Sequence, residues 1–290
     1  MSTLARSWLY VPAHHADRIG KALRSGADAV VLDLEDAVPA ERKDEAREVA
    51  ATALRGLGDP TTRPQVWVRV NPPHSPWGEA DLTGLAGLDL DGVRVPRAED
   101  PAAVAAVADA LGCPLQLLLE TARGLLAAPH LAVAHPAVAG IGLGEADLAA
   151  DLRTGSSSGL EWARGWVVAV ARAVGLASPV QSVYTSVADL DGLRATTAAG
   201  RELGFFGRSV VHPRQIAPVH EVYRPTGEET ARAREVVEAL ESARGRGEAA
   251  VLTSDGRFVD PAVVSRAQLV LELAALDQPT PAQIRSEENR

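Results

Sequence analysis

Short apolar runs that alternate with amphipathic stretches constrain the fold of this chain more than any other feature. The runs are continuous, which is typical of strands buried on both faces of a parallel sheet. About eight strands are expected, over residues 7–12, 28–35, 65–71, 92–96, 115–120, 138–144, 180–184 and 208–213. Helices are expected after most of them, over 15–26, 40–56, 100–111, 121–128, 160–174 and 189–203. This order favours an α/β fold with a closed (β/α)₈ TIM barrel, and a doubly wound open sheet is the alternative.

The character of the sequence changes near residue 226, which predicts a second part of the chain. A charged helix begins there, a hairpin is expected to turn at Asp255-Gly256, and a last helix is expected over 261–276. The expected parts are a catalytic barrel domain over 1–225, a C-terminal lid or oligomerisation extension over 226–276 and a disordered tail over 277–290.

Composition excludes several classes of partner and site. The 290 residues carry a formal net charge of −9, which argues against a nucleic-acid or membrane surface as the main partner. The single cysteine, Cys113, cannot form an internal disulfide, and this fits a reducing compartment. No apolar run approaches the ~20 residues of a membrane span, and the N-terminal run is too short for a signal peptide. A soluble cytoplasmic protein is therefore expected.

Acidic residues follow several of the predicted strands. Asp33, Glu35 and Asp36 end one strand, Glu120 ends another, and Asp147 follows a third. In a barrel these strand ends meet at one rim, where catalysis takes place. Gathered carboxylates repel one another unless a cation or an arginine neutralises them. A Mg²⁺ site at Glu120 and Asp147 is therefore predicted. For each acid alone, a helix N-cap or first-turn charge is the alternative interpretation.

Basic residues also stand at predicted strand ends. Arg69 follows the apolar run "VWV", so its guanidinium needs an anion. That anion is either a ligand or, in the structural alternative, Asp33 or Glu35. Arg94 lies at the end of the next strand. His212 precedes Pro213, and a capping or packing role is as plausible there as catalysis. No G-x-S-x-G elbow is present, which argues against a serine nucleophile.

Six stretches occur in an order that resembles a known family. They are "RSWLYVPAHHADRIGKALRSGADAVVLDLEDAVPAERKDEAR" (6–47), "VWVRVNPPHSPWGEADL" (66–82), "LLLETARGLLAAPHLA" (117–132), "GLGEADLAADL" (142–152), "GRELGFFGRSVVHPRQIAPVHEVYRPT" (200–226) and "DGRFVDPAVVSRAQ" (255–268). Together they are similar to the citrate lyase β-subunit-like family of the wider HpcH/HpaI aldolase/citrate lyase group. That group includes malyl-CoA and citramalyl-CoA lyases.

The resemblance implies a Mg²⁺-dependent (β/α)₈ carbon–carbon lyase, with Mn²⁺ as a possible substitute. The implied substrate is a 3-hydroxyacyl-coenzyme A (CoA) such as malyl-, citramalyl- or citryl-CoA. Its products are an acyl-CoA and a 2-oxo acid. Such family members are commonly homo-oligomers, either trimers or hexamers.

By the same resemblance, Glu120 and Asp147 hold the metal, and Arg69 contacts the carbonyl or the developing enolate. Glu35 and Asp36 hydrogen-bond metal-bound waters and position Arg69. Asp260 matches an acid that is proposed in relatives to reach a neighbouring subunit's site as the acid/base. The segment Gly144, Glu145 and Ala146 is expected to contact the substrate.

Some positions depart from the family pattern and leave the substrate open. Gln181 and Ser186 stand where relatives often have acids, and Ala13 stands where many have glycine. CoA phosphates are expected to bind basic residues, and the candidates on the first helix are Arg18, Lys21 and Arg24, with a solvated helix face as the alternative. The alternative functions are a malyl-CoA-type thioesterase or synthase, a CoA-independent 2-oxo-acid aldolase and a catalytically silent binding subunit.

Overall fold

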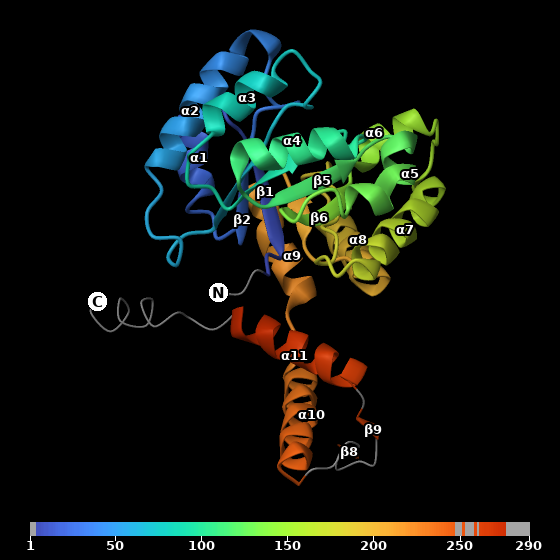
Figure 1. Ribbon diagram of the computed structural model, residues 1–290. Helices are drawn as coiled ribbons and strands as arrows, with labels where there is room; N and C mark the ends of the chain where they lie inside the picture. Colours follow the sequence, from blue (N-terminus) through green and yellow to red (C-terminus); the bar gives the residue numbers. More distant parts are fainter. Residues whose placement is uncertain (1–3, 247–250, 253–257, 260, 277–290) are drawn as a thin grey trace, which may run out of the picture. The chain divides into compact units, whose positions relative to one another are not determined.

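The computed structural model describes residues 4–246, 251–252, 258–259 and 261–276 (Figure 1). The chain divides into two compact units, one over 5–222 and one that begins at Tyr223. The expected turn at Asp255-Gly256 and the expected disordered tail lie outside the described residues.

The first unit is built on a sheet of seven parallel strands in the order β6-β5-β4-β3-β2-β1-β7. The strands are β1 (Ser7–Pro12), β2 (Ala29–Asp33), β3 (Gln65–Arg69), β4 (Gly92–Val95), β5 (Leu115–Leu119), β6 (Val138–Leu143) and β7 (Arg208–Val210). All five residues of β2 are buried, as the continuous apolar run predicts. The sheet is curled, and helices cover its outer face (Figure 1).

Helices follow the strands of this sheet along the chain, and the last of them comes after β7. They are α1 (Ala16–Ala22), α2 (Lys43–Arg55), α3 (Gly78–Leu85), α4 (Pro101–Leu111), α5 (Ala122–Leu131), α6 (Glu145–Asp151), α7 (Glu161–Ala173), α8 (Leu190–Leu203) and α9 (Ile216–Tyr223). Local chemistry sets their ends. The Asp100 carboxylate accepts the N–H of Ala102 at the start of α4, and Gly112 ends this helix with a left-handed φ of 62°. The helices α3 and α9 were not expected from the sequence.

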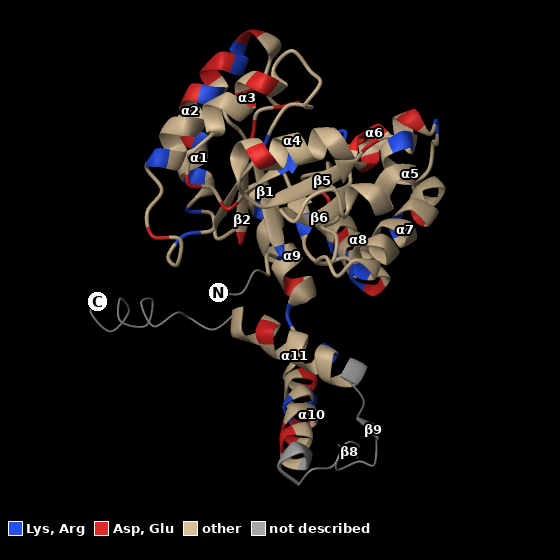
Figure 2. Ribbon diagram, in the orientation of Figure 1, with Lys and Arg blue, Asp and Glu red and all other residues tan. Residues whose placement is uncertain are grey.

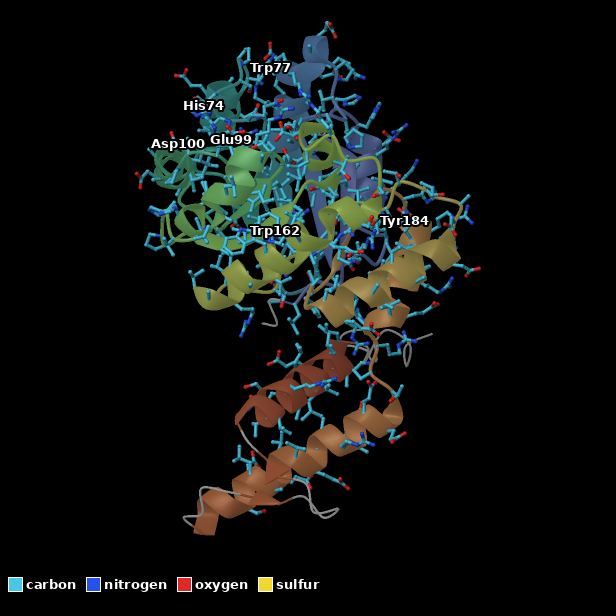
Figure 3. All side chains as sticks on the ribbon, turned by 90° about the vertical axis from the view of Figure 1, so that its right-hand side faces the viewer. His74, Trp77, Glu99, Asp100, Trp162 and Tyr184 are labelled. Carbon is cyan, nitrogen blue, oxygen red and sulfur yellow. The ribbon has the colours of Figure 1, made fainter. Side chains whose placement is uncertain are left out.

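The outer helices are amphipathic. On α7, Val167 and Ala171 are buried, whereas Trp162 is 60% exposed on the outside (Figure 3). Acidic and basic residues are interspersed along α2 (Figure 2). Arg42, at the N-cap of this helix, donates to Glu45. No helix in the described part of the chain is long and apolar enough to cross a membrane.

The strand expected over 180–184 is not formed, which corrects the prediction of eight strands. Only Gln181 makes a bridge, to Arg208 of β7. Toward β6, the hydroxyl of Ser182 donates to the carbonyl of Leu143 at 2.6 Å in place of a backbone ladder. Pro179 contributes to the irregularity because it has no N–H to donate. The segment over 177–183 therefore fills the gap between β6 and β7 without being a strand.

The second unit contains α10 (Gly227–Arg246), β8 (Val251–Leu252), β9 (Phe258–Val259) and α11 (Pro261–Leu276). β8 and β9 pair antiparallel. Ala233 and Val236 of α10 pack with Val264 and Ala267 of α11. A role for this unit as a lid or in oligomerisation stays a prediction.

Candidate functional site

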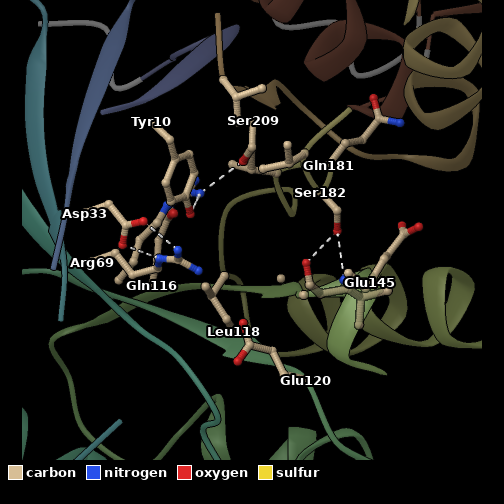
Figure 4. Close-up of a pocket in the computed structure, with 18 of the residues that line it drawn as sticks. Tyr10, Asp33, Arg69, Gln116, Leu118, Glu120, Glu145, Gln181, Ser182 and Ser209 are labelled. Atoms are coloured by element: carbon tan, nitrogen blue, oxygen red, sulfur yellow. Dashed lines mark hydrogen bonds and ion pairs between the residues drawn. The ribbon is translucent and has the colours of Figure 1, made fainter. Parts of the chain in front are cut away.

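A cavity of about 560 Å³ opens at the carboxyl ends of the parallel strands (Figure 4). Several of the predicted site residues line it: Arg18, Asp36, Arg69, Glu120, Gly144, Glu145, Ala146 and Asp147. Figure 4 shows Asp33 and Arg69 on one side of the pocket and Ser182 and Glu145 on the other. The expected gathering of strand ends at one rim therefore produces a real cavity.

Arg69 ends β3 and is held by three carboxylates. Its Nε and Nη2 each donate to an oxygen of Asp33, both at 2.7 Å. Its Nη1 lies 2.8 Å from Glu35 Oε2 and 3.2 Å from Asp36 Oδ2. Burial alone would lower the pKa of Arg69, but the Asp33 carboxylate outweighs it and the net pKa is raised. The structural alternative for Arg69, a salt bridge with Asp33, is present, and the guanidinium still lines the cavity.

Asp33 serves this arrangement by anchoring the loop that follows it. Its two oxygens accept the backbone N–H groups of Glu35 and Ala37, at 3.0 and 3.3 Å. The side chain is buried and makes a two-pronged contact with Arg69, which fixes the plane of the guanidinium. Asp33 therefore positions Arg69, as the sequence suggested for a pair between strand ends.

Glu35 is buried behind the cavity wall and is not among the residues that line the cavity. Burial raises its pKa to about 8, against the opposing effect of Arg69. The Oε2 contact with Arg69 is an ion pair without hydrogen-bond alignment, and this oxygen has no hydrogen-bond partner in the described part of the chain. Asp36, by contrast, lines the cavity and is largely exposed.

Lys43 holds the loop at Glu35 through hydrogen bonds. The sequence interpretation missed this residue. Its Nζ donates to the carbonyls of Leu34 and Glu35, at 2.7 and 2.8 Å, and to Asn71 Oδ1 at 2.7 Å. Burial lowers the pKa of Lys43. The side-chain amide of Asn71 donates in turn to Asp81 at 2.7 Å. A lysine on the apolar side of an amphipathic helix was the available signal, because α2 buries Lys43 together with its alanines.

Glu120 directly follows β5 and is 3% exposed. Its Oε2 accepts the N–H of Arg97 at 3.0 Å, and Arg97 adopts a left-handed φ of 47°. A Cβ on Gly144 would lie only 2.4 Å from Glu120 Oε1, so glycine is required there for the carboxylate to reach the rim. Burial raises the pKa of Glu120 to about 7, with a smaller contribution from the charge of Asp147.

Asp147 lies in the first turn of α6, is exposed, and lines the same cavity as Glu120. No group of three or more His, Cys, Asp or Glu side chains in the described ranges forms a metal cage. Two carboxylates with open positions for water and substrate are the arrangement that suits Mg²⁺ in enzymes. The neighbouring Glu145 is held by Arg164, whose Nε donates to Oε1 at 3.0 Å.

Other residues singled out from the sequence are less central. Among the CoA candidates only Arg18 lines the cavity, and Lys21 is exposed and lies 3.5 Å from Asp17. Arg24 is not among the lining residues. His212 caps the turn after β7 by accepting the N–H of Arg214, so the capping interpretation describes its contacts. Asp260 lies outside the described residues.

Gln181, one of the departures from the family pattern, lines the pocket wall through its backbone position, but its side chain points away from the pocket (Figure 4). Its Nε2 donates to the carbonyl of Thr196 at 3.0 Å, on the side of α8. A Cβ on Gly200 of α8 would overlap this amide, so glycine makes room for it. The amide of Gln181 therefore serves packing against α8.

Known proteins are similar to this chain over most of its length. The family model of HpcH/HpaI aldolase/citrate lyase matches residues 6–213. A citrate lyase subunit beta-like protein of Deinococcus radiodurans is 40% identical, over 92% of this chain and 96% of its own length. A (3S)-malyl-CoA thioesterase of Cereibacter sphaeroides is 36% identical, over 88% and 89%.

Among solved structures, the protein CitE of Mycobacterium tuberculosis in complex with magnesium, acetoacetate and coenzyme A is similar. It has a TM-score of 0.75 and 31% sequence identity, over 94% of this chain and 99% of that one. The family match and the relatives cover the whole site described above. The chain belongs to the HpcH/HpaI aldolase/citrate lyase family.

Proposed function

We propose that the protein is a Mg²⁺-dependent carbon–carbon lyase that cleaves a 3-hydroxyacyl-CoA, such as malyl-, citramalyl- or citryl-CoA, into an acyl-CoA and a 2-oxo acid. The observation that carries the proposal is the meeting of Glu120, Asp147 and Arg69 on one cavity. The similarity to CitE, which was crystallised with magnesium, acetoacetate and coenzyme A, supports it.

The residues at the rim fit a divalent cation. Glu120 is a buried carboxyl group whose pKa is raised to about 7 by burial, and a bound cation would favour its charged form. Asp147 adds a second negative charge to the same cavity. Carboxylate oxygens are the ligands that Mg²⁺ and Mn²⁺ prefer, and Glu120 and Asp147 would hold either ion. When bound, the ion supplies Lewis-acid polarisation of a carbonyl.

The protein's own residues account for charge and proton movement. Cleavage needs a base to take the proton from the substrate hydroxyl, and the electrons of the breaking carbon–carbon bond then pass to the acyl-CoA fragment as an enolate. Arg69, fixed by Asp33, is oriented to stabilise negative charge on an oxygen. The enolate carbon finally takes up a proton. A carboxyl group suits both proton steps. Asp260, which matches the acid proposed in relatives as the acid/base, is the candidate for this role.

The proposal is tested by incubating the protein with malyl-CoA and citramalyl-CoA in the presence and absence of Mg²⁺. We expect release of an acyl-CoA and a 2-oxo acid only with the metal. Glu120→Ala should lower the affinity for Mg²⁺ by at least about tenfold, because it removes a ligand. The exposed Glu79→Gln on α3 is the control and should leave the affinity unchanged. Full Mg²⁺ affinity in Glu120→Ala would refute the metal assignment.

A second candidate function is hydrolysis of malyl-CoA, favoured by the similarity to a (3S)-malyl-CoA thioesterase. The same cavity could deliver water to the thioester. Product analysis separates the two activities, since hydrolysis gives malate and free CoA, whereas cleavage gives a 2-oxo acid and acetyl-CoA. A synthase would run the cleavage backwards. A CoA-independent aldolase would cleave free hydroxy acids, and a silent binding subunit would turn over none of these substrates.

We also propose that the protein is a homo-oligomer, a trimer or a hexamer. The reason is that Asp260 matches an acid proposed in relatives to serve a neighbouring subunit's site. Light scattering on the full chain tests this against the protomer mass of 30.4 kDa. A mass of one protomer at working concentrations would contradict it.

A further inference from the structure

Two arginines are neighbours in the sheet but differ in their partners. Arg69 of β3 and Arg94 of β4 are paired in register. The ring of Tyr10 lies 5.1 Å from the guanidinium carbon of Arg69 and 5.5 Å from that of Arg94. Arg69 contacts three carboxylates. In the described part of the chain, no carboxylate oxygen lies within 4.0 Å, the limit for an ion pair, of a guanidinium nitrogen of Arg94.

Arg94 is nevertheless one of the most deeply buried charged residues, with 2% of its surface exposed. Its Nη1 donates to the Tyr10 hydroxyl at 2.8 Å and to the Ser209 hydroxyl at 3.1 Å. The guanidinium lies 4.3 Å from the centre of the Trp8 ring. Its Nε and Nη2 have no hydrogen-bond partner among the described residues. A buried charge without a counter-ion is strongly unfavourable, and aromatic contact offsets only part of this.

The cavity extends from the rim to Arg94. Its inner part is lined by Tyr10, Arg94, Gln116, Gly140 and Ser209, and Figure 4 shows Tyr10 and Ser209 on the far side of the pocket from Glu120. Sheets of this curled parallel type usually fill their interior with bulky branched side chains. Here β6 presents a glycine, Gly140, beside Gln116, and this leaves the interior open.

The inner end of the cavity is distinct from the metal-binding rim. Gln116 is the register partner of Arg94 on β5, and Glu120 lies four residues further along the chain. At about 3.3 Å per residue, this separates the two levels by about 13 Å along the strand. No hydrogen bond to the amide of Gln116 is found within the described ranges. The amide therefore offers a second polar group beside the guanidinium.

We propose that Arg94, assisted by Gln116, is an anion subsite that binds the distal carboxylate of a dicarboxylic 2-oxo acid. The inference rests on the proposed function, because it places the 2-oxo end of the same molecule at the rim with Glu120 and Asp147. A guanidinium matches the planar geometry of a carboxylate and would gain the counter-ion that it lacks.

The test compares acids that differ only in the distal carboxylate. Calorimetry with Mg²⁺ present measures 2-oxoadipate against 2-oxohexanoate, and 2-oxoglutarate against 2-oxopentanoate. We expect each diacid to bind the wild-type protein at least about tenfold more tightly than the matched acid without the distal carboxylate, as a charge-assisted hydrogen bond allows. In Arg94→Met this preference should fall below about twofold. Arg63→Met, which removes another largely buried arginine outside the cavity, should retain it.

Pyruvate separates this inference from the proposed function, because it lacks the distal carboxylate. Pyruvate should bind the wild-type protein and Arg94→Met equally and only with Mg²⁺. If pyruvate binds but the matched acids do not differ, or if their difference survives Arg94→Met, the subsite is refuted. If no acid binds with Mg²⁺, both proposals fail. If only the diacids bind, and their binding needs Arg94, the subsite is supported and the proposed function is not. Even if Arg94→Met does not fold, the comparison of each diacid with its matched monoacid on the wild-type protein still tests the subsite.

Discussion

The burial of carboxyl groups sets the chemistry at the scale of single residues. Glu35 and Glu120 are each less than one-tenth exposed, and their pKa values are raised to about 8 and about 7. In both cases burial is the main cause. It outweighs the opposing effect of Arg69 on Glu35, and of the Arg97 N–H and Arg69 on Glu120. Both acids therefore hold protons at a pH where exposed carboxyl groups have lost them.

This burial makes the stability of the metal-free protein depend on pH. Glu35 has an ordinary pKa of 4.5 in the unfolded chain and about 8 in the folded one. Between these values the folded state binds the extra proton, so stability falls as the pH rises, by at most about 1.4 kcal/mol per pH unit for one group. Glu35→Gln should flatten this fall, as measured by urea unfolding in EDTA at several pH values from 5 to 8.

The control for this prediction is Glu79→Gln, because Glu79 is exposed on α3. It should show the same dependence of stability on pH as the wild-type protein. An unchanged pH dependence in Glu35→Gln would show that Glu35 is ionised in the folded protein.

A substitution at Gly144 tests whether this glycine holds the Glu120 carboxylate at the rim. A Cβ at this position would lie 2.4 Å from Cγ and Oε1 of Glu120, so Gly144→Ala should displace the carboxylate from the rim. We expect a fall in Mg²⁺ affinity of at least about tenfold, measured by calorimetry. Gly155→Ala is the matched control, because nothing lies within 4 Å of its added Cβ. Equal Mg²⁺ affinity in both variants would show that Gly144 does not hold Glu120 in place.

At the scale of elements, the strand ends are where the sequence was most informative. Continuous apolar runs such as β2 are recognisable because both faces of the strand are buried. The run over 180–184 resembles them, yet it forms only one bridge, at Gln181. Whether an apolar segment becomes a strand depends on the backbone of its neighbours, and the local sequence does not contain that information.

The segment that replaces this strand depends on one hydroxyl. Ser182 Oγ donates to the carbonyl of Leu143 and accepts the N–H of Glu145 at 3.4 Å. Ser182→Ala should therefore lower the free energy of unfolding by about 1 kcal/mol and accelerate amide exchange at Glu145. Hydrogen exchange followed by mass spectrometry measures this, with the exposed Ser158→Ala as the control. Unchanged exchange at Glu145 would mean that this hydroxyl does not hold the wall of the cavity.

At the scale of the whole molecule, the sequence could not reveal contacts between distant parts of the chain. Arg94 reaches Tyr10 and Ser209, which lie 84 and 115 residues away. Lys43 reaches Asn71, 28 residues away. Strand-end acids could be predicted because position along a strand determines which rim a side chain reaches. Which of them would be buried, and beside which arginine, depends on packing that only the folded chain defines.

We propose that Glu120 and Asp147 hold a divalent cation at the rim of the cavity. Crystals of the full chain soaked in Mn²⁺ and pyruvate test it most directly, by anomalous diffraction at the manganese absorption edge. We predict a single strong anomalous peak bonded to a carboxylate oxygen of Glu120 and one of Asp147, and no such peak in Glu120→Ala. A peak elsewhere in the molecule, or none at this pair of carboxylates at saturating Mn²⁺, would contradict the claim.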